Sequence, residues 1–422
     1  MRTLNTIVGA AALLASSLVW AQSGPMTLQS AFQRAQQIDP LYLAGKAEFE
    51  GDSLTANSST WAFFPQAKVS SGQVETDGGG RRDSLTITQP ILSADRMATF
   101  KEKEPRTRLA EAKLALREID LAKRLYTSFV EMAQARESLK ENKARLSALE
   151  LQVTSAKRLL SLSQGTTTDV RDAEVKLLQA RGEEISLQGE LRSAERRYFS
   201  IVGAAPSNVA IEVSPEKAKR ISAAAAKLGQ HLPDPVGLAD AHPSVLVARA
   251  EAELAELDSD RARSAWMPEL NLVHTQTRLD GTNNSFTGLN FSLPLSATNY
   301  ATLQSAGALA VKSEQEAADA TREIVLEIEQ LKTAIEFGAN QVALQQAAVD
   351  AAQLSVEANE KSYKGGVRTS TDVLNSIEVL YTVKSELIKS LLQLSEDLLS
   401  LSLIEGTKAS DSLADIEQLV LR

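Results

Sequence analysis

The sequence predicts a mainly α-helical fold with a small β component, in which one helix–strand–strand–helix–helix unit occurs twice. Three observations support this. Only 5% of the 422 residues are aromatic, and the 21 Gly and 12 Pro are few for an all-β chain. Leu, Ala, Glu, Lys, Gln and Ser dominate, which is typical of long helices. Landmark prolines and glycines also recur at a constant spacing, which indicates an internal repeat.

The composition excludes several classes of function. The 45 Lys and Arg residues face 54 Asp and Glu, with a net charge of −9 and no basic block, which argues against a nucleic acid as partner. The absence of Cys rules out disulfides, thiolate metal sites and thiol nucleophiles. The three histidines are scattered, and no metalloprotease, phosphate-loop or esterase motif occurs. We therefore expect no enzyme activity, no cofactor and no metal.

The N-terminus predicts export. Arg2 is the only charge before an apolar stretch at residues 7–19, and Val19-Trp20-Ala21 supplies the small-x-small pattern of a cleavage site. The stretch is too short for a transmembrane helix, and polar residues follow it. Residues 1–21 are therefore predicted to be a signal peptide that is removed before folding.

The remaining chain is predicted to be a duplication. Pro40 and Pro243 are separated by the same distance as Pro65 and Pro268, and as the two Thr-Asp-Val tripeptides that begin at Thr168 and Thr371. Biased composition alone would not align prolines in this way. We expect a first repeat at residues 22–202, an equatorial linker at 203–239, a second repeat at 240–406 and a C-terminal tail at 407–422.

Each repeat is predicted to begin with a helix, at residues 27–60 and 240–264, followed by two strands. The strands are expected at 67–76, 83–92, 270–279 and 286–295 because apolar residues alternate there, as at Leu289, Phe291 and Leu293. The intervening residues 77–80 and 280–284 have turn composition. A tilted strand of about ten residues is long enough to cross a bilayer.

Long helices follow the strands. Apolar residues recur in steps of three and four, the spacing of a coiled-coil seam, as at Leu387, Leu391, Leu394 and Leu398. A helix over residues 94–160 would be about 100 Å long at 1.5 Å per residue, with Pro105 either bending it or marking its first turn. Gly165, Gly365 and Gly366 are predicted to reverse the chain, so that each long helix becomes an antiparallel coiled-coil hairpin.

Four strands cannot close a barrel, and an open sheet edge in lipid leaves backbone groups without hydrogen bonds. Copies of the chain must therefore complete the sheet. Two copies would give eight strands with a filled interior, whereas three would give twelve strands with a lumen. We expect a trimer, with a 12-stranded membrane β-barrel continued by an α-helical tunnel. Aromatic residues at the strand ends fit a membrane–water girdle or, alternatively, core packing at helix–strand corners: Trp61, Phe63, Phe64 and Trp266.

In this order of elements the chain resembles the TolC family of outer-membrane efflux ducts, over essentially the whole mature length. The landmarks of the resemblance are Asp39-Pro40, His242-Pro243, Gln89-Pro90, Leu293-Pro294 and the Gly…Thr-Asp-Val tips. The resemblance implies a homotrimer in the lipid of the cell outer membrane, with its helical part in the periplasm. It also implies a passive gated duct for efflux or type I secretion, supplied by a periplasmic adaptor and an inner-membrane ABC or proton-driven transporter.

A second interpretation stays open, a periplasmic coiled-coil scaffold or adaptor that never enters a membrane. The transported substrate is not revealed by the sequence under either interpretation.

The resemblance also implies roles for residues at the hairpin tips. Tyr363 and Arg368 match positions that bond to a Thr-Asp pair on the other repeat's tip, here Thr168 and Asp169, and so form a periplasmic gate. An Arg–carboxylate contact is strong, oriented and breakable. Asp372 matches the first of two acidic residues in a constriction ring. Asn375 occupies the second acidic position, and its equivalent in the first repeat is Asp172. The alternative is that Thr168/Asp169 and Thr371/Asp372 only cap helices.

Overall fold

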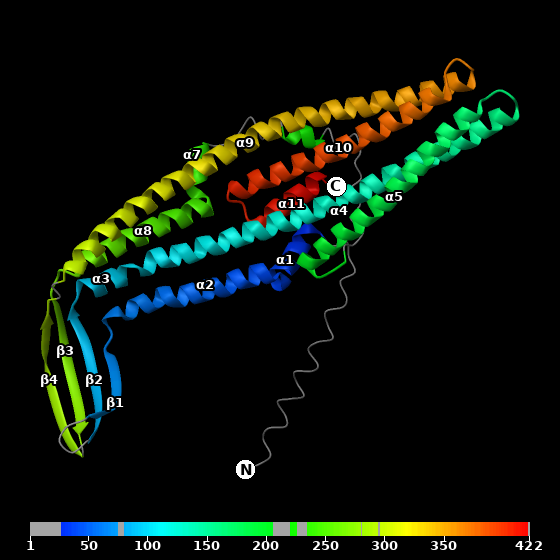
Figure 1. The fold of residues 1–422 in the computed structure, drawn as a ribbon. Helices are drawn as coiled ribbons and strands as arrows, with labels where there is room; N and C mark the ends of the chain where they lie inside the picture. Colours follow the sequence, from blue (N-terminus) through cyan, green and yellow to red (C-terminus); the bar gives the residue numbers. More distant parts are fainter. Residues whose placement is uncertain are drawn as a thin grey trace, which may run out of the picture.

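The computed structural model describes residues 27–74, 80–205, 220–225, 234–279, 281–293 and 296–420. The predicted signal peptide and much of the predicted linker lie outside these residues. Figure 1 shows an elongated molecule with a four-stranded sheet at one end and the turns of two long helical hairpins at the other.

The order helix–strand–strand–helix–helix occurs twice along the chain. The first set comprises α1 (Leu28–Ile38), α2 (Pro40–Ser58), the short 3-10 helix η1 (Ser59–Phe63), β1 (Gln66–Val74), β2 (Gly80–Leu92), α3 (Ala94–Lys101), α4 (Lys103–Ser161) and α5 (Thr167–Val202). The second set comprises α7 (Pro235–Ala241), α8 (Pro243–Ser264), β3 (Glu269–Leu279), β4 (Thr282–Ser292), α9 (Ala297–Lys364), α10 (Ser370–Ile404) and α11 (Ala409–Val420). Among the described helices, none combines the length and apolar character needed to cross a membrane.

Two of the predicted helices are divided by proline. The helix expected at residues 27–60 is split into α1 and α2 at Asp39-Pro40, because a residue before proline is displaced from the helical region. Asp39 then caps α2 by accepting the N–H of Tyr42 at 2.8 Å. Burial acts to raise the pKa of Asp39, but hydrogen bonds from Arg124 and Tyr42 outweigh it and hold the pKa below its usual value.

The helix expected at residues 94–160 is likewise divided, into α3 and α4, at Glu102. Pro105 cannot donate to the carbonyl group four residues before it and clashes with that group. The break therefore falls one turn ahead of Pro105, which occupies the first turn of α4. Of the two roles that the sequence left open for this proline, the structure shows the first-turn position.

The sheet is antiparallel throughout, in the order β1-β2-β3-β4. The strands extend close to the predicted ranges, but the loop predicted at residues 280–284 is too long. Thr282, Asn283 and Asn284 pair with Leu279, Arg278 and Thr277 and so belong to β4. Gly281 has φ 86°, a conformation that suits glycine and permits a tight turn. The predicted ends of the strands at residues 76 and 295 lie outside the described residues.

The two faces of the sheet differ in polarity. Directly opposed residues in an antiparallel pair lie on the same face. One face carries Val69 opposite Leu85, Gln89 opposite Leu272, and Leu270 opposite Phe291. The other face is largely hydroxyl and amide, with Ser70 2.7 Å from Ser84, Thr86 3.4 Å from Thr275, and Asn271 opposite Asn290. We call these the apolar face and the polar face of the sheet.

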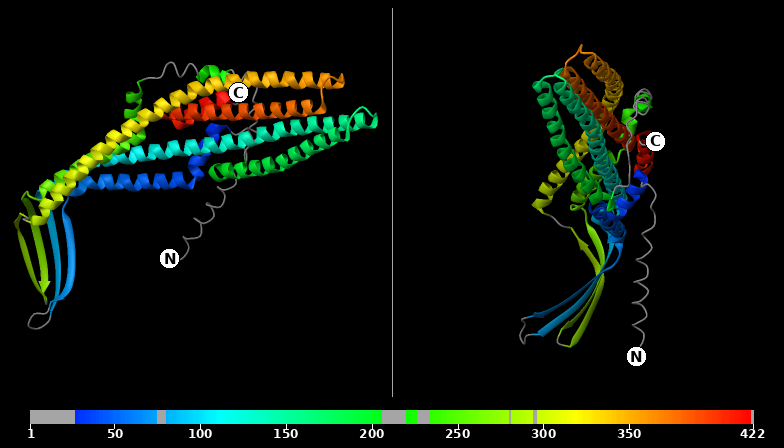
Figure 2. Two further views of the ribbon diagram at one scale, coloured as in Figure 1. Left: turned by 45° about the horizontal axis from the view of Figure 1, so that its top comes forward. Right: turned by 90° about the vertical axis from the view of Figure 1, so that its right-hand side faces the viewer.

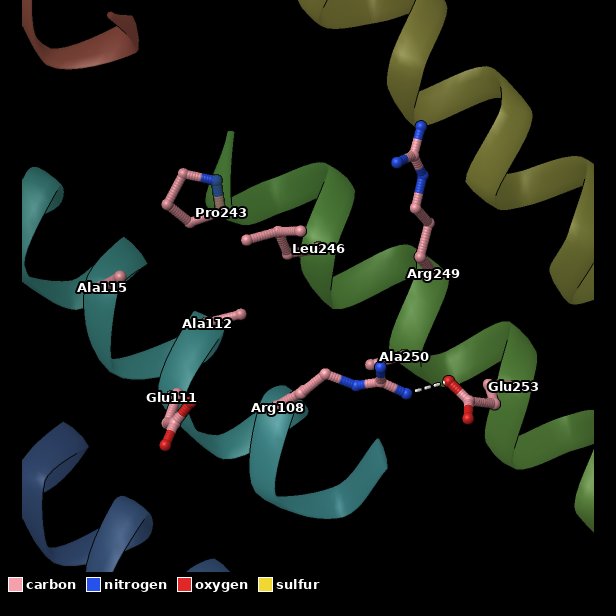
Figure 3. Close-up of a pocket in the computed structure, with 9 residues that line it drawn as sticks. All are labelled: Arg108, Glu111, Ala112, Ala115, Pro243, Leu246, Arg249, Ala250 and Glu253. Atoms are coloured by element: carbon pink, nitrogen blue, oxygen red, sulfur yellow. Dashed lines mark hydrogen bonds and ion pairs between the residues drawn. The ribbon is translucent and has the colours of Figure 1, made fainter. Parts of the chain in front are cut away.

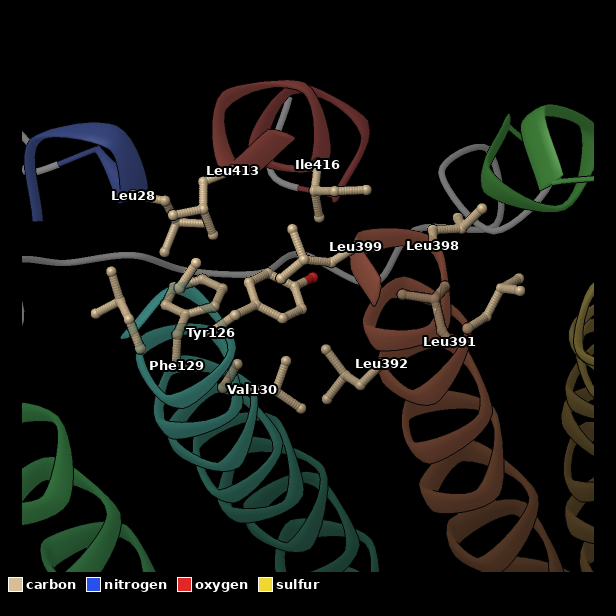
Figure 4. Close-up of a cluster of buried hydrophobic side chains, with 14 of the residues drawn as sticks. Leu28, Tyr126, Phe129, Val130, Leu391, Leu392, Leu398, Leu399, Leu413 and Ile416 are labelled. Atoms are coloured by element: carbon tan, nitrogen blue, oxygen red, sulfur yellow. The ribbon is translucent and has the colours of Figure 1, made fainter. Parts of the chain in front are cut away.

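The main hydrophobic core lies midway along the helices. Figure 4 shows Tyr126, Phe129 and Val130 of α4 beside Leu391, Leu392 and Leu399 of α10, with residues of α11 and α1 above them. The predicted C-terminal tail thus contributes a helix, α11, whose Leu413 and Ile416 are buried in this cluster. The core therefore joins the two hairpins near their middle.

Candidate functional site

The candidate site is at the two hairpin tips, at the opposite end of the molecule from the sheet (Figure 1). In the second tip, Gly365 caps α9 and Gly366 has φ 73°, so glycine is required at the predicted reversal. In the first tip the left-handed residue is Ser163, with φ 58°, and not Gly165. Gly165 has a different role, because a Cβ there would lie only 3.2 Å from the Cβ of Leu159.

The helices that follow the two tips, α5 and α10, each begin with a capping box. Thr166 accepts the N–H of Asp169 at 3.1 Å, and the Asp169 carboxylate accepts the N–H of Thr166 at 2.9 Å. Thr369 and Asp372 make the same pair of bonds, at 3.2 and 3.0 Å. The prediction that Thr168/Asp169 and Thr371/Asp372 are the N-caps is therefore wrong, because each N-cap is a threonine that lies earlier in the chain. Thr166 and Thr369 are the caps because a capping box needs its hydroxyl three residues before the carboxylate.

The four predicted gate residues are not joined within one chain. Arg368 is exposed, and its Nη1 lies 3.9 Å from Asp372 Oδ1 on its own tip. Among the described residues, no hydrogen bond or ion pair connects Arg368 or Tyr363 to Thr168 or Asp169. Tyr363 instead packs against a cluster to which both hairpins contribute, with Leu149 and Ala173 from the first and Val373 from its own.

The predicted ring residues lie close to these caps. Asp372 is in the first turn of α10, Asn375 lies one turn later, and Asp172 is in the corresponding part of α5. Asn375 and Asp172 are exposed and Asp372 is partly so. Hydrogen bonds from the backbone N–H and the hydroxyl of Thr369 lower the pKa of Asp372, so its carboxylate is ionised at neutral pH. Within the described ranges, no group of His, Asp or Glu has the arrangement of a metal site.

The strongest polar contacts between the hairpins lie further from the tips. Arg145 of α4 donates hydrogen bonds to the carboxylate of Glu378 of α10, at 2.6 and 2.7 Å from Nη2 and at 3.1 Å from Nε. The Arg145 guanidinium also lies 4.6 Å from the ring centre of Tyr381. Lys384 bonds to Glu141 at 2.8 Å. We call these five residues the inter-hairpin clasp. The clasp could not be predicted from the sequence, because its paired residues are more than 200 positions apart and no local motif marks them.

The wall of the bundle nearer the sheet contains a pocket of about 500 Å³ between α4 and α8. Figure 3 shows Arg108 of α4 paired with Glu253 of α8 across it, beside Ala112 and Leu246. Small apolar side chains and one ion pair provide no nucleophile or general base, so this pocket indicates helix packing and not catalysis.

The predicted interface aromatics cluster where the helices meet the sheet. Trp61 and Phe64 precede β1 and Trp266 precedes β3, and all three are exposed, whereas Phe63 is half-buried. Their exposure leaves a membrane-interface role as a prediction.

The family model described as "Outer membrane efflux protein" matches residues 237–407, which include α8, β3, β4, α9 and α10. The second half of the chain thus resembles the outer membrane efflux protein family. It is 26% identical over 349 residues to the proteases secretion protein PrtF of Dickeya chrysanthemi, covering 77% of this chain and 74% of that protein. It is 22% identical over 398 residues to the outer membrane protein TolC of Escherichia coli, covering 85% and 78%.

The fold matches a solved outer membrane protein. VceC of Vibrio cholerae superimposes with a TM-score of 0.75 at 17% identity, covering 91% of this chain and 96% of that one. These comparisons confirm the mainly helical fold with a small antiparallel sheet and the predicted resemblance to the TolC family. The relatives are outer membrane proteins, which agrees with the predicted location in the cell outer membrane. They are channel proteins, which is consistent with the expectation that this chain is not an enzyme.

Proposed function

We propose that three copies of this chain form a gated, passive exit duct across the outer membrane. The observation that carries this proposal is the sheet of one chain. In the described residues β1 and β4 each pair on one side only, so the sheet has two open edges. Because unpaired backbone groups cost several kcal/mol each in lipid, β1 of one copy is expected to pair with β4 of the next.

The two faces of the sheet support the same arrangement. Twelve strands enclose a lumen, and a barrel in lipid needs an apolar exterior and a polar interior. The apolar face, with Val69, Leu85 and Phe291, suits the lipid side. The polar face, with Ser70, Thr86 and Asn271, suits a water-filled channel.

The helices also have faces without a partner in one chain. In the hairpin half of the molecule, α4 and α10 lie in the middle, with α5 and α9 on the two flanks (Figures 1 and 2). Large apolar side chains on both flanks are between 52% and 72% exposed, namely Val175, Leu178 and Ile185 of α5 and Phe337, Leu344 and Leu354 of α9. An exposed apolar stripe on a helix of this type indicates a further helix partner. We infer that α5 of one copy packs against α9 of its neighbour and so closes a helical tunnel.

The proposed partners follow from the relatives. PrtF is named for protease secretion, and relatives of this family are the outer membrane components of tripartite efflux and type I secretion systems. We propose that this chain likewise receives its substrates from an inner-membrane ABC or proton-driven transporter through a periplasmic adaptor.

We further propose that the tips form the gate of the duct. Arg368 is exposed and, among the described residues, makes only a long contact with Asp372, so it could reach Asp169 or Thr168 of a neighbouring hairpin in the assembly. Three copies of Asp372 would then line the constriction ring, with Asn375 neutral at the second position and Asp172 adding charge from the other tip.

Single-channel conductance in planar lipid bilayers tests the gate. Arg368→Ser and Asp169→Ala are each expected to raise conductance, because each removes one side of the closing contact. Asp169 also belongs to a capping box, and Thr166→Ala is the matched control that removes the cap but keeps the carboxylate. Unchanged conductance in Arg368→Ser and Asp169→Ala, or an equal rise in Thr166→Ala, would contradict the gate. Failure of the unmodified chain to form channels would contradict the duct itself.

A further inference from the structure

A second pocket, of about 590 Å³, lies where the helices meet the sheet, between α3 and α8. Its lining is largely apolar and includes Leu92 at the end of β2, Met97 of α3, Leu257 of α8 and Met267 just before β3. Leu92, Met97 and Met267 are between 49% and 61% exposed. An open apolar pocket of this size on the surface of a chain indicates a ligand or partner.

The pocket is distant from the surfaces that neighbouring copies are proposed to cover. β2 leads into α3 and α8 leads into β3, and these two strands are the inner strands of the sheet. The open edges are β1 and β4. The pocket therefore lies beside the inner strands, away from the two edges at which neighbouring copies are proposed to pair, and it stays accessible in a ring of copies.

The pocket adjoins the apolar face of the sheet. Leu92 pairs with Leu270, which in turn pairs with Phe291, so these three side chains lie on that face. Trp266, which is 41% exposed, lies next to Met267 in the sequence. The apolar surface of the sheet thus runs into the pocket at the helical end.

Two cations line the same pocket. Lys101 of α3 is exposed and has no ion pair in the part of the chain that the structure describes. Arg263 of α8 pairs with Asp260 one turn away on its own helix at 3.3 Å, and both side chains are exposed. One carboxylate against two cations leaves the pocket with an excess of positive charge. Long basic side chains beside apolar surface are suited to holding a charged headgroup at the edge of a membrane.

We propose that this pocket binds an anionic glycerophospholipid from the membrane leaflet next to the helices. Part of an acyl chain would fill the space between Met97, Leu257 and Met267, and the headgroup phosphate would lie between Lys101 and Arg263. The inference rests on the proposed function, because it requires the sheet to lie in the membrane with its apolar face toward lipid.

Native mass spectrometry of the full chain in detergent tests the proposal. The probes are phosphatidylglycerol and phosphatidylcholine with identical acyl chains. The unmodified protein is expected to bind phosphatidylglycerol more tightly. The double variant Lys101→Gln/Arg263→Gln should weaken that binding about tenfold, since each charge near a membrane surface contributes a factor of about five and Asp260 already offsets part of it. Lys103→Gln, an exposed lysine outside the pocket, is the matched control and should change nothing.

A second variant tests the position of the acyl chain. Ala94→Trp would fill the pocket from α3 without altering its charge and is expected to weaken the binding of both lipids. Equal affinity for the two lipids, equal affinity in the double variant and in Lys103→Gln, or binding that Ala94→Trp leaves intact would each overturn the proposal. Channel formation by the same preparations in planar bilayers separates the two claims. If channels form normally and the lipid results fail, only the pocket assignment falls.

Discussion

At the scale of single residues, the inter-hairpin clasp is the most specific contact between the two halves of the chain. Only 10% of the Arg145 side chain is exposed. Its guanidinium forms a charge-assisted ion pair with the carboxylate of Glu378 and lies against the ring of Tyr381. A pair held in this way resists separation. The clasp is therefore suited to holding α4 and α10, and with them the two hairpins, together.

The first residue-scale prediction concerns this clasp. Arg145→Ala should lower the free energy of unfolding by about 2 kcal/mol, less than the loss for a fully buried pair because Glu378 is 24% exposed. A double-mutant cycle with Glu378→Ala should give a coupling of about 1 kcal/mol in denaturant titrations. Arg181→Ala is the control, because Arg181 and Glu150 are both 55% exposed and such pairs contribute little. Zero coupling between Arg145 and Glu378 would show that their ion pair does not contribute to the free energy of unfolding.

The second residue-scale prediction concerns pH. Burial raises the pKa of Glu396 above the usual 4.5, assisted by the charges of Asp397 and Glu131, while a hydrogen bond with Thr127 acts in the other direction. Burial also raises the pKa of Asp397 above 3.8, although Gln393 lowers it. A carboxyl group whose pKa is raised in the folded state stabilises the fold at low pH, and this contribution is lost as the pH rises through the raised value.

These two carboxyl groups are therefore expected to favour the fold near pH 5 over pH 8, whereas burial lowers the pKa of His242 and that group acts in the opposite direction. Glu396→Gln should raise stability at pH 8 and flatten the dependence between these values, because the amide has no charge to bury. Thermal unfolding followed by circular dichroism at several pH values checks this. The same loss of stability with pH in the variant and the unmodified chain would contradict it.

At the scale of elements, local chemistry sets most boundaries. The order of helices and strands could be predicted because prolines, glycines and the change from period two to period 3.5 are local signals. The division at Asp39 was missed, although the backbone restriction that Pro40 imposes interrupts the helix there. The division at Glu102 agrees with one of the two roles predicted for Pro105. The two-residue error in each cap arose because Thr168 and Thr371 directly precede the aspartates, whereas a capping box has its hydroxyl three residues before the carboxylate, at Thr166 and Thr369.

The element-scale prediction tests the corrected caps. Thr369→Ala should destabilise the first turn of α10 by about 1 kcal/mol, because the N–H of Asp372 loses its acceptor. Hydrogen exchange should therefore become faster at residues 370–374. Thr371→Ala is the matched control, since this threonine lies inside the helix and caps nothing in the structure. Equal acceleration in the two variants would contradict the assignment of Thr369 as the cap.

At the scale of the whole molecule, the sequence could predict the duplicated architecture from its recurring prolines and glycines. The need for partner copies, argued from backbone hydrogen bonding in lipid, stays a prediction. The sequence could not predict the clasp or the pocket between α3 and α8. Each brings together residues that are distant along the chain, and no periodic pattern records such a contact. The gate residues were predicted by resemblance, and within one chain the structure does not join them; their proposed bonds between neighbouring copies stay a prediction.

The central claim is that this chain completes its sheet, and the proposed helical tunnel, with copies of itself. The most direct test is the mass of the particle extracted from outer membranes with mild detergent and measured by native mass spectrometry. The account predicts three copies of the chain in one complex. A folded single copy recovered from the water-soluble fraction would contradict it and would favour the periplasmic scaffold.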